Sequence, residues 1–464
     1  MMDDKEFAAE VLLALPYRAN DQQVAVVAAL SRFCAIGARP DGVFVLNGYA
    51  GTGKTSIIGA LVKTLAVMKL KTVILAPTGR AAKVAGRYSQ GKTSTIHRRI
   101  FHQISDTPGE GFALSPNRST ETIFIVDEAS MIADRPGQTD SLLALLVRYV
   151  YSGRRCSMIM LGDIAQLPPV GCDCAPAMRP ERLRQLGLQP RTFTLDITER
   201  QGADSGILHN ATYIRRLLMS PLPGMSPKLF AEGFEDIRVI SQQELADELS
   251  DSWGKVGIDD TVIITRSNKR ANDYNMAIRN LVMMAEEPLQ QGDRLIVAKN
   301  DYYWSAQNHL PNLIANGDQV VVDWVGRREK AYGRWYVDVE LTLPAEQRRV
   351  AAKVMLRSLM TDGPSIPQAE MQQLHSAVAA AQEGTPTEQY MAALVDPYYN
   401  SLQVKYGYCV TCHKAQGGQW AHVYIDMGGI APDMIDTTFY RWLYTAITRA
   451  TSRLYFIAPT IPIT

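Results

Sequence analysis

The stretch VFVLNGYAGTGKTS, residues 43–56, joins a short apolar run to a glycine-rich turn and then to a helical pattern. It satisfies the motif G-x-x-x-x-G-K-[ST] with a strand before it and a helix after it, which is the context the motif requires. Glycines let the backbone curl with successive N–H groups pointing inward, and the N-terminus of the following helix adds partial positive charge. The stretch therefore predicts an α/β fold that binds nucleotide phosphates, rather than a glycine-rich turn before an ordinary helix.

Each residue of this loop has an expected part in binding ATP and Mg²⁺. The side chain of Lys54 can reach the β- and γ-phosphates, and the hydroxyl of Thr55 can bind Mg²⁺. Backbone N–H groups form the rest of the predicted cradle, which consists of Gly48, Gly51, Thr52, Gly53 and Lys54. The loop predicts nucleotide hydrolysis but not the process that hydrolysis drives.

Length and composition restrict the kind of protein. A chain of 464 residues is too long for one core and suggests two to four domains at roughly 100–200 residues each. Its 46% hydrophobic and 20% charged residues are ordinary for a globular protein. No apolar run approaches the roughly 20 residues of a membrane span, and the start MMDDKEFAAE is too acidic for a signal peptide. We therefore expect a cytoplasmic protein without a membrane partner.

The net charge of +1 hides a basic stretch between residues 71 and 105, which contains no Asp or Glu. Such a stretch is either a solvated helix face or a surface for a polyanion. Its seven basic residues are Lys71, Arg80, Lys83, Arg87, Lys92, Arg98 and Arg99.

Six cysteines allow two sharper interpretations. The segment CVTCH, residues 409–413, matches a c-type haem attachment pattern, and Cys172 with Cys174 could contribute thiolates to a zinc site. Haem attachment needs an oxidising compartment, and a C-x-C pair is poor spacing for tetrahedral zinc. Free, reduced cysteines are the favoured interpretation.

The first 200 residues alternate strand-like apolar runs with helical patterns, which is typical of a parallel sheet with helices on both faces. The predicted strands of this set are 43–46, 72–77, 122–129, 155–163 and 192–197. A second such set is predicted at 236–241, 260–267, 422–427 and 453–459. Two similar α/β domains are the economical interpretation.

Two insertions interrupt these sets. Residues 291–404 begin with alternating runs separated by Gly-Asp turns, which predict antiparallel hairpins. Helical patterns follow at about 345–360, 367–383 and 386–395, so we interpret the range as a β-barrel-like module with a helical extension. A smaller insertion at 84–121 holds the turn DTPGEG between two short strands.

Two carboxylates and an amide follow predicted strands of the first domain. Asp127 and Glu128 end the strand TIFIVDEA, at the carboxyl edge where open α/β sheets bind ligands. There Asp127 can hold Mg²⁺ through water, and Glu128 can orient and deprotonate the attacking water. The next strand ends in LGDIAQLPPV, whose Gln166 can donate to the γ-phosphate.

Three more side chains are candidates for the nucleotide site. Gln23 in NDQQVAVV can read the hydrogen-bonding edge of adenine, or it can simply begin a helix. Arg200 in ITERQG and Arg449 in LYTAITRA carry the planar, always charged group that a developing γ-phosphate charge requires.

These motifs, in their order along the chain, resemble those of the superfamily 1 helicases of the B class, the RecD-like and phage Dda-like enzymes. The resemblance covers nearly the whole chain through NDQQ, GYAGTGKT, APTGRAAK, GKTSTIHR, VDEAS, GDIAQLPPV, TERQ, CHKAQGGQW and YTAITRA. The segments GKTSTIHR and HKAQG favour the B class, and the compact size favours a Dda-like enzyme. Many relatives carry an aromatic residue before the arginine of TERQ, whereas this chain has Glu199, so the choice of base stays open.

The resemblance implies two RecA-like P-loop domains with ATP in the cleft between them. Gln23 would contact adenine, Gln166 would sense the γ-phosphate, and Arg200 and Arg449 would be arginine fingers. The implied domains are residues 1–83 with 122–205, a small insertion at 84–121, residues 206–290 with 405–464, and an SH3-like β-rich insertion at 291–404.

The resemblance also implies single-stranded DNA across the top of both domains, which assigns the basic stretch to phosphate contact and removes the haem interpretation. The implied contacts are Pro77, Thr78, Thr95, His97, Thr411, His413 and Lys414, with Phe112 as a strand-separating pin. The expected function is an ATP-dependent DNA helicase moving 5′ to 3′ during replication, recombination or repair. Forked DNA is the expected substrate, and single-strand-binding or replication and recombination proteins are candidate partners. The alternative is a nucleotide-dependent switch or protein remodeller that does not move on nucleic acid.

Overall fold

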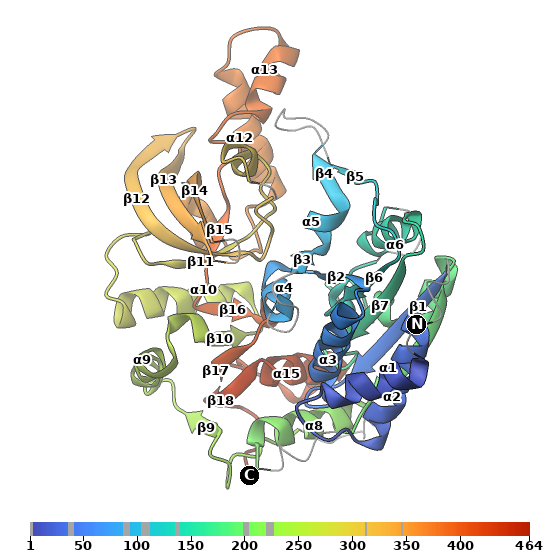
Figure 1. Cartoon of the computed structure of the whole chain (residues 1–464). Coiled ribbons are helices and arrows are strands. Elements are labelled where there is room, and N and C mark those ends of the chain that lie inside the picture. The colour runs from blue at the N-terminus through green and yellow to red at the C-terminus, as the bar shows by residue number, and fades with distance from the viewer. Residues whose placement is uncertain are drawn as a thin grey trace.

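The computed structural model contains two parallel β-sheets, one antiparallel sheet and a small hairpin (Figure 1). In Figure 1 the antiparallel sheet and helices α12 and α13 lie above the second parallel sheet, and the first parallel sheet lies beside it. The structure describes residues 3–35, 41–86, 93–103, 112–134, 140–197, 204–219, 227–310, 313–344 and 347–464. No helix that it describes is both long and apolar enough to cross a membrane.

The first sheet has six parallel strands in the order β3-β2-β6-β7-β1-β8. Helices α1 to α3 cover one face of this sheet, and α6 and α7 cover the other. Each face has its own hydrophobic core, so side chains of successive β1 residues point into alternate cores. Phe44 and Leu46 face the first core, and Val43 and Val45 face the second. The strands are β1 (Gly42–Gly48), β2 (Lys71–Ala76), β3 (Thr93–Thr95), β6 (Thr122–Val126), β7 (Ser157–Gly162) and β8 (Gln189–Leu195). The helices are α1 (Asp4–Leu13), α2 (Asp21–Ala35), α3 (Lys54–Val67), α4 (Gly79–Gly86), α5 (Ile96–Ile100), α6 (Leu142–Ser152) and α7 (Pro180–Gln185).

The second sheet has five parallel strands in the order β16-β10-β17-β18-β9. Helices α8 and α15 cover one face, and α9 and α10 cover the other. The strands come from two separated parts of the chain: β9 (Ile237–Ile240), β10 (Thr261–Thr265), β16 (Cys409–Thr411), β17 (Trp420–Ile425) and β18 (Ala450–Ile457). The helices are α8 (Gly206–Met219), α9 (Leu245–Val256), α10 (Asn268–Ala277), α14 (Cys412–Ala415) and α15 (Thr437–Ile447).

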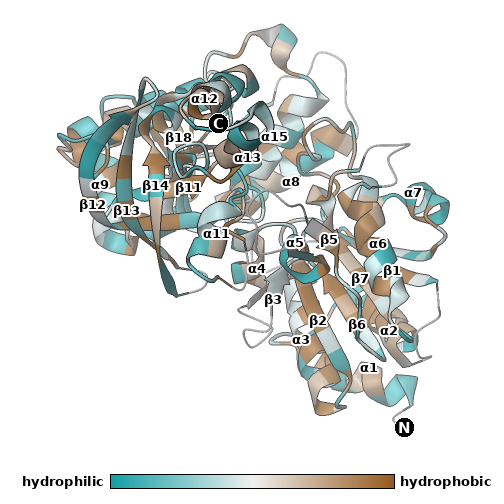
Figure 2. Ribbon diagram, turned by 90° about the horizontal axis from the view of Figure 1, so that it is seen from above, coloured by the Kyte–Doolittle hydropathy of each residue, from teal (hydrophilic) through white to brown (hydrophobic). Residues whose placement is uncertain are grey.

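The antiparallel sheet forms the predicted insertion, with strand order β14-β13-β12-β11-β15. Its inner side chains share one core with β10 and β17, so this module is packed against the second sheet. Figure 2 shows hydrophilic residues along β12 and β13, in contrast to the apolar strands of the first sheet. The elements are β11 (Arg294–Val297), α11 (Tyr303–Gln307), β12 (Gln319–Ala331), β13 (Arg334–Leu343), β14 (Arg348–Met355), α12 (Gln368–Ala380), α13 (Pro386–Leu394) and β15 (Val404–Tyr406).

One predicted helix is wrong. Residues 345–360 contain β14, which pairs with β13 along its length. The run is rich in alanine and arginine, which suits a helix, but Val350, Ala352 and Val354 are buried at every second position. Burial against β13 therefore overrides local propensity. The two later helices are confirmed as α12 and α13.

The small insertion contains a two-stranded hairpin of β4 (Phe101–Gln103) and β5 (Phe112–Leu114), as predicted. The turn DTPGEG and the side chain of Phe112 lie outside the described residues. Strand β3 lies within the range predicted for the insertion, yet it pairs with β2. The first sheet therefore extends further than the sequence indicated. The predicted class of two parallel-sheet α/β domains is confirmed, and the SH3-like form of the antiparallel module stays a prediction.

Candidate functional site

The phosphate loop follows β1 directly and ends where α3 begins at Lys54. Gly51 and Gly53 have φ values of 74° and 81°, the left-handed region that favours glycine. A Cβ on Gly53 would also collide with the hydroxyl of Tyr17. The loop therefore has the curled backbone that a phosphate cradle needs, and glycine is required there by both conformation and space.

Lys54 is the first residue of α3 and lies at the end of this loop. Its Nζ donates to the carbonyl of Gly48 at 2.9 Å and to that of Gly162 at 3.2 Å, so it joins the ends of β1 and β7. Thr55 is the second residue of α3 and is exposed. Thr52 is buried, and its hydroxyl donates to the carbonyl of Tyr49 at 2.8 Å, which stiffens the loop.

Gln23 is fully buried under the loop. Its Nε2 donates to the carbonyl of Thr52 at 3.1 Å, and its Oε1 accepts from the backbone N–H of Asn20 at 3.1 Å. In this arrangement both polar atoms of the Gln23 amide form hydrogen bonds within the protein. The predicted contact of Gln23 with adenine stays a prediction, and it would require one of these bonds to change.

Glu128 follows β6 with φ of 51°, a region that residues other than glycine seldom adopt. Its backbone N–H donates to Asp127 Oδ1 at 2.8 Å, which fixes the turn. Glu128 Oε2 is buried and lacks a hydrogen-bond partner among the described residues. Strained backbone and an unpaired buried oxygen are typical of a group held ready for a ligand or a water. The arrangement suits the predicted roles, in which Asp127 and Thr55 would hold Mg²⁺ and Glu128 would orient water.

The loop after β7, residues 163–167, carries Gln166. Asp163 begins this loop with only 1% of its surface exposed, and its Oδ1 accepts from the backbone N–H of Ala165 at 2.9 Å. Burial raises the pKa of Asp163, and the nearby charge of Lys54 opposes that shift. Gln166 Oε1 is buried and unpaired within the described structure. An amide oxygen only accepts, so the predicted donation from Gln166 to the γ-phosphate would have to come from Nε2 and stays a prediction.

Helix α15 of the second domain forms hydrogen bonds with the loop at residues 163–167. The sequence did not predict this contact. Three side chains at positions i, i+3 and i+4 lie on one face of α15 and bind it: Arg441, Tyr444 and Thr445. Thr445 Oγ1 accepts from the backbone N–H of Leu167 at 2.8 Å, and Arg441 donates to the carbonyls of Ile164 and Gln166. The only sequence signal for this contact was a polar face on an otherwise buried helix.

The two predicted arginine fingers have different outcomes. Arg200 lies outside the described residues. Arg449 is 4% exposed, and its guanidinium donates to the carbonyls of Thr445 at 3.0 Å and Gly418 at 3.2 Å. These partners belong to the second domain, so in this arrangement Arg449 braces its own domain. Its role toward the γ-phosphate stays a prediction.

We expect Arg449→Ala to lower the steady-state rate of ATP hydrolysis with DNA present by about 10²-fold, the typical effect of removing one preorganised donor from a transition state. The rate should be measured well below the unfolding temperature of the variant, because two carbonyls also lose their donor. A wild-type rate, combined with a lower unfolding temperature, would show that Arg449 only braces the second domain.

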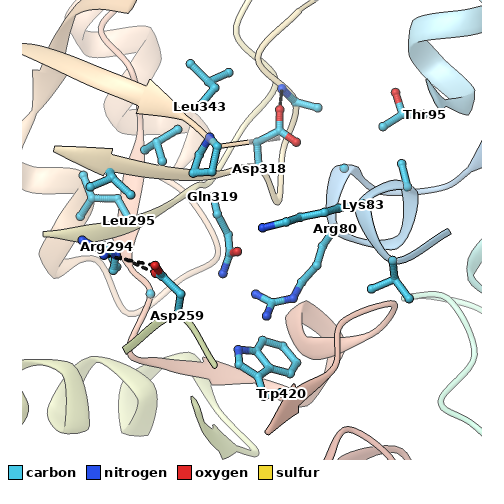
Figure 3. A pocket seen from close by; sticks show the side chains of 18 of the residues that line it. Arg80, Lys83, Thr95, Asp259, Arg294, Leu295, Asp318, Gln319, Leu343 and Trp420 are labelled. Atoms are coloured by element: carbon cyan, nitrogen blue, oxygen red, sulfur yellow. Dashed lines mark hydrogen bonds and ion pairs between the residues drawn. The ribbon is translucent and has the colours of Figure 1, made fainter. Parts of the chain in front are cut away.

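A cavity of about 620 Å³ lies between α4 of the first domain, the antiparallel module and the second domain. Arg80, Lys83 and Arg98 line it from the first domain, and Gln319 and Arg294 line it from the opposite wall. Figure 3 shows Arg80 and Lys83 extending from α4 toward Gln319 and Trp420. The basic stretch of the sequence thus supplies one wall of the cavity, and that wall suits a polyanion. The other walls carry Asp259, Asp260 and Asp318, and Arg294 is paired with Asp259.

The two domains meet at the base of this cavity. The guanidinium of Arg80 stacks over the ring of Trp420 at 3.5 Å from its centroid. A Cβ on Gly417 would lie 3.3 Å from Thr78 Oγ1 and 2.8 Å from the Cβ of Ala81, so the segments APTGR and HKAQGG are in contact. Segments more than 300 residues apart in the sequence therefore form one surface.

The structure brings some of the predicted DNA contacts to this surface. Thr95 lines the cavity, and Pro77 and Thr78 directly precede the lining residue Gly79. His97 is half-buried in α5, and burial lowers its pKa, so its ring is neutral at pH 7 and suits stacking better than charge pairing. The remaining contacts lie at the carboxyl end of the edge strand β16: Thr411 is its last residue, and His413 and Lys414 are in α14 directly after it. All of these stay predictions.

The positions of the cysteines do not suit a haem attachment site or a zinc site. Cys409 and Cys412 are each 1% exposed and belong to the hydrophobic cores on opposite faces of the second sheet. A haem joined to both thiols would have to displace both cores, so this interpretation is wrong. Cys172 and Cys174 are free thiols, and the described residues contain no cluster of three or more metal-binding side chains.

Two family models match the chain. A model described as an AAA domain matches residues 18–215, and a model described as a UvrD-like helicase C-terminal domain matches residues 406–457. The first match covers the six-stranded sheet, and the second covers β16 to β18 of the second sheet.

Individual relatives are distant. An uncharacterized protein of Methanocaldococcus jannaschii is 22% identical over 89% of this chain and 36% of that protein. The ATP-dependent RecD2 DNA helicase of Deinococcus radiodurans is 26% identical over 64% of this chain and 40% of that protein. The chain thus spans about two fifths of the length of these relatives. Among solved structures, the Pif1 helicase from Bacteroides in complex with ADP-AlF3 and ssDNA aligns over 94% of this chain and 92% of that one, with 14% identity and a TM-score of 0.47.

Proposed function

We propose that this chain, which carries the two domains of a superfamily 1 helicase of the B class, is an ATP-dependent DNA helicase that moves along single strands. The matches to an AAA domain and a UvrD-like helicase C-terminal domain confirm the resemblance that the motifs indicated. Movement along single-stranded DNA, its 5′ to 3′ direction and the unwinding of forks are our proposals.

One observation supports the proposal most directly: the two candidate sites are joined through the second domain. The loop with Gln166 is bound by α15, and Gln416 Nε2 donates to the carbonyl of Leu167 in the same loop at 2.6 Å. Gln416 directly precedes Gly417, which contacts α4 at the wall of the cavity. A change at the phosphate loop can therefore reach the cavity through a short series of direct contacts, as a motor requires.

The proposed chemistry uses residues of both domains. The chain would bind ATP through the phosphate loop and hold Mg²⁺ with Thr55 and Asp127. Bound Mg²⁺ supplies positive charge that neutralises the phosphates during transfer. Glu128 would orient and deprotonate the attacking water, while Lys54 and an arginine stabilise the developing charge.

The decisive experiment measures ATP hydrolysis with and without a single-stranded DNA oligonucleotide. We expect the oligonucleotide to raise kcat. Equal rates would favour the alternative, a nucleotide-dependent switch or remodeller that does not move on nucleic acid. A second measurement compares unwinding of forks with a single 5′ tail and a single 3′ tail, and faster unwinding from the 5′ tail is expected.

The position of Lys83 in the cavity wall leads to a separate prediction about DNA binding. Lys83→Ala should weaken binding of single-stranded DNA roughly three- to tenfold and lower the slope of log affinity against log salt by about 0.7, the value for one lost phosphate contact. Lys63→Ala is the matched control, because Lys63 is an exposed lysine on α3 and does not line the cavity. Equal salt slopes in both variants would place the DNA elsewhere.

The strand-separating role of Phe112 stays a proposal. In the antiparallel pairing of β4 with β5, Phe112 lies opposite Gln103. A hairpin of this kind can block the displaced strand, and an aromatic ring at its end can stack on a base. Single-strand-binding and replication or recombination proteins are proposed partners.

A further inference from the structure

Tyr444 connects the second domain to the phosphate loop itself. Its hydroxyl accepts a hydrogen bond from the backbone N–H of Ala50 at 2.8 Å and donates one to Asp163 Oδ2 at 2.7 Å. Ala50 lies in the middle of the phosphate loop, and Asp163 begins the loop that carries Gln166. One side chain of α15 thus binds two of the first-domain loops that are predicted to face the nucleotide. The residue is 1% exposed, so water does not compete for these bonds.

The donors and acceptors in these two hydrogen bonds of Tyr444 follow from the groups on either side of its hydroxyl. A backbone N–H can only donate, and a carboxylate can only accept, so the hydroxyl between them must do both. Burial raises the pKa of the Tyr444 hydroxyl well above its usual value, so the hydroxyl keeps the proton that it donates. Removing the hydroxyl would leave a backbone donor and a buried carboxylate without their shared partner.

Tyr444 is one of several neighbouring residues through which the second domain contacts the first. Thr445 and Arg441 hold the same loop of the first domain from the same face of α15. From α8, the guanidinium of Arg215 lies over the ring of Tyr49, 4.6 Å from its centroid, beside Ala50. The second domain therefore contacts the phosphate loop through two helices, and Tyr444 is the contact that reaches a phosphate-loop N–H.

Phosphate loops bind phosphate through backbone N–H groups of this kind. In the structure the N–H of Ala50 is occupied by Tyr444, so a triphosphate in the loop and the Tyr444 hydroxyl act on the same segment. We propose that Tyr444 is a positioning residue whose hydroxyl couples the phosphate loop to the second domain, so that single-stranded DNA in the cavity controls the rate of ATP hydrolysis. This inference rests on the proposed function, because it explains how the two sites of that motor communicate.

The test is Tyr444→Phe, which keeps the buried ring and removes only the hydroxyl. The measured quantity is the ratio of kcat with a saturating DNA oligonucleotide to kcat without it. We expect this ratio to fall about tenfold or more, the factor that corresponds to losing a hydrogen bond to a charged group. The Kd for the oligonucleotide should stay at the wild-type value, because Tyr444 does not line the cavity.

Tyr424→Phe is the matched control. Tyr424 is a fully buried tyrosine of the second domain, whose hydroxyl donates to the carbonyl of Glu248 at 2.7 Å, within the second domain. An unchanged ratio in Tyr444→Phe would overturn the inference, and so would an equal fall in Tyr424→Phe, because the effect would then be general destabilisation.

Asp163→Asn tests the same bond from its other end. Where Tyr444→Phe does not fold, the ratio in Asp163→Asn alone is expected to fall, and an unchanged ratio would overturn the inference. Equal losses in the two single variants, with no further loss in the double variant, would support coupling through this bond. Fully additive losses would overturn it. A wild-type enzyme with no DNA stimulation at all would instead refute the proposed function, and the two failures are therefore distinguishable.

Discussion

The Lys54→Ala variant will bind single-stranded DNA and fail to hydrolyse ATP. In the structure the Lys54 ammonium donates to carbonyls at the ends of β1 and β7, so it is already held at the mouth of the phosphate loop. Removing a preorganised cation from a phosphoryl-transfer site costs at least about 10²–10³ in kcat. Lys83 lines the cavity and Lys54 does not, so DNA binding should not depend on Lys54.

Two measurements check this prediction: the rate of ATP hydrolysis and the fluorescence anisotropy of a labelled oligonucleotide. Lys63→Ala is again the control, since it removes an exposed lysine from the same helix. Hydrolysis at the wild-type rate in Lys54→Ala would refute the assignment of the nucleotide site. Parallel loss of hydrolysis and DNA binding would mean that Lys54 is needed for the fold.

Glu128→Gln should keep ATP binding and lose turnover by about 10²–10⁴-fold, the usual range for removing a positioned general base. The amide has the same shape as the carboxylate, and the backbone bond from Glu128 to Asp127 does not involve the changed atoms. The strained backbone at φ 51° and the unpaired Oε2 both indicate that Glu128 is held for a reacting water rather than for packing.

The check on Glu128 separates binding from chemistry. ATP affinity is measured by equilibrium binding, and turnover by single-turnover hydrolysis. Glu121→Gln serves as the control, because Glu121 begins the same region of the chain but is exposed and paired with Arg155. A collapse of ATP affinity in Glu128→Gln would assign Glu128 to the metal or to the fold instead.

The sequence predicted the parallel sheets well because their strands are continuous apolar runs. Val43 to Leu46 and Val262 to Ile264 are buried on both faces, and continuous apolar runs of this length are typical of central strands in a parallel sheet. Short edge strands were missed or misplaced: β3 and β16 have three residues each, too few to show a pattern. Strand β14 was misread as a helix because alanine and arginine conceal its alternation, which only the pairing with β13 reveals.

The candidate site was predictable where one segment carries the chemistry. The phosphate loop and the Asp127-Glu128 pair follow strands directly, so their positions are fixed by local structure. Contacts between the domains were not predictable in this way. Tyr444 lies almost 400 residues from Ala50, and no local pattern indicates that their atoms meet. The sequence also did not show that Arg449 donates to carbonyls of its own domain, because an arginine in a motif does not reveal which acceptor its guanidinium will bind.

The interrupted order of the second sheet has a consequence for synthesis on the ribosome. Strand β10 is buried along its whole length, yet both of its neighbours, β16 and β17, are encoded after the antiparallel module. Cys409 is translated about 140 residues after Thr265, and at about 5–20 residues per second this delay lasts roughly 7–30 s. During that interval β10 is an unpaired apolar strand, the kind of segment that aggregates or recruits a chaperone. Truncated nascent chains that stop before Cys409 should therefore bind chaperones more strongly than chains released after β18.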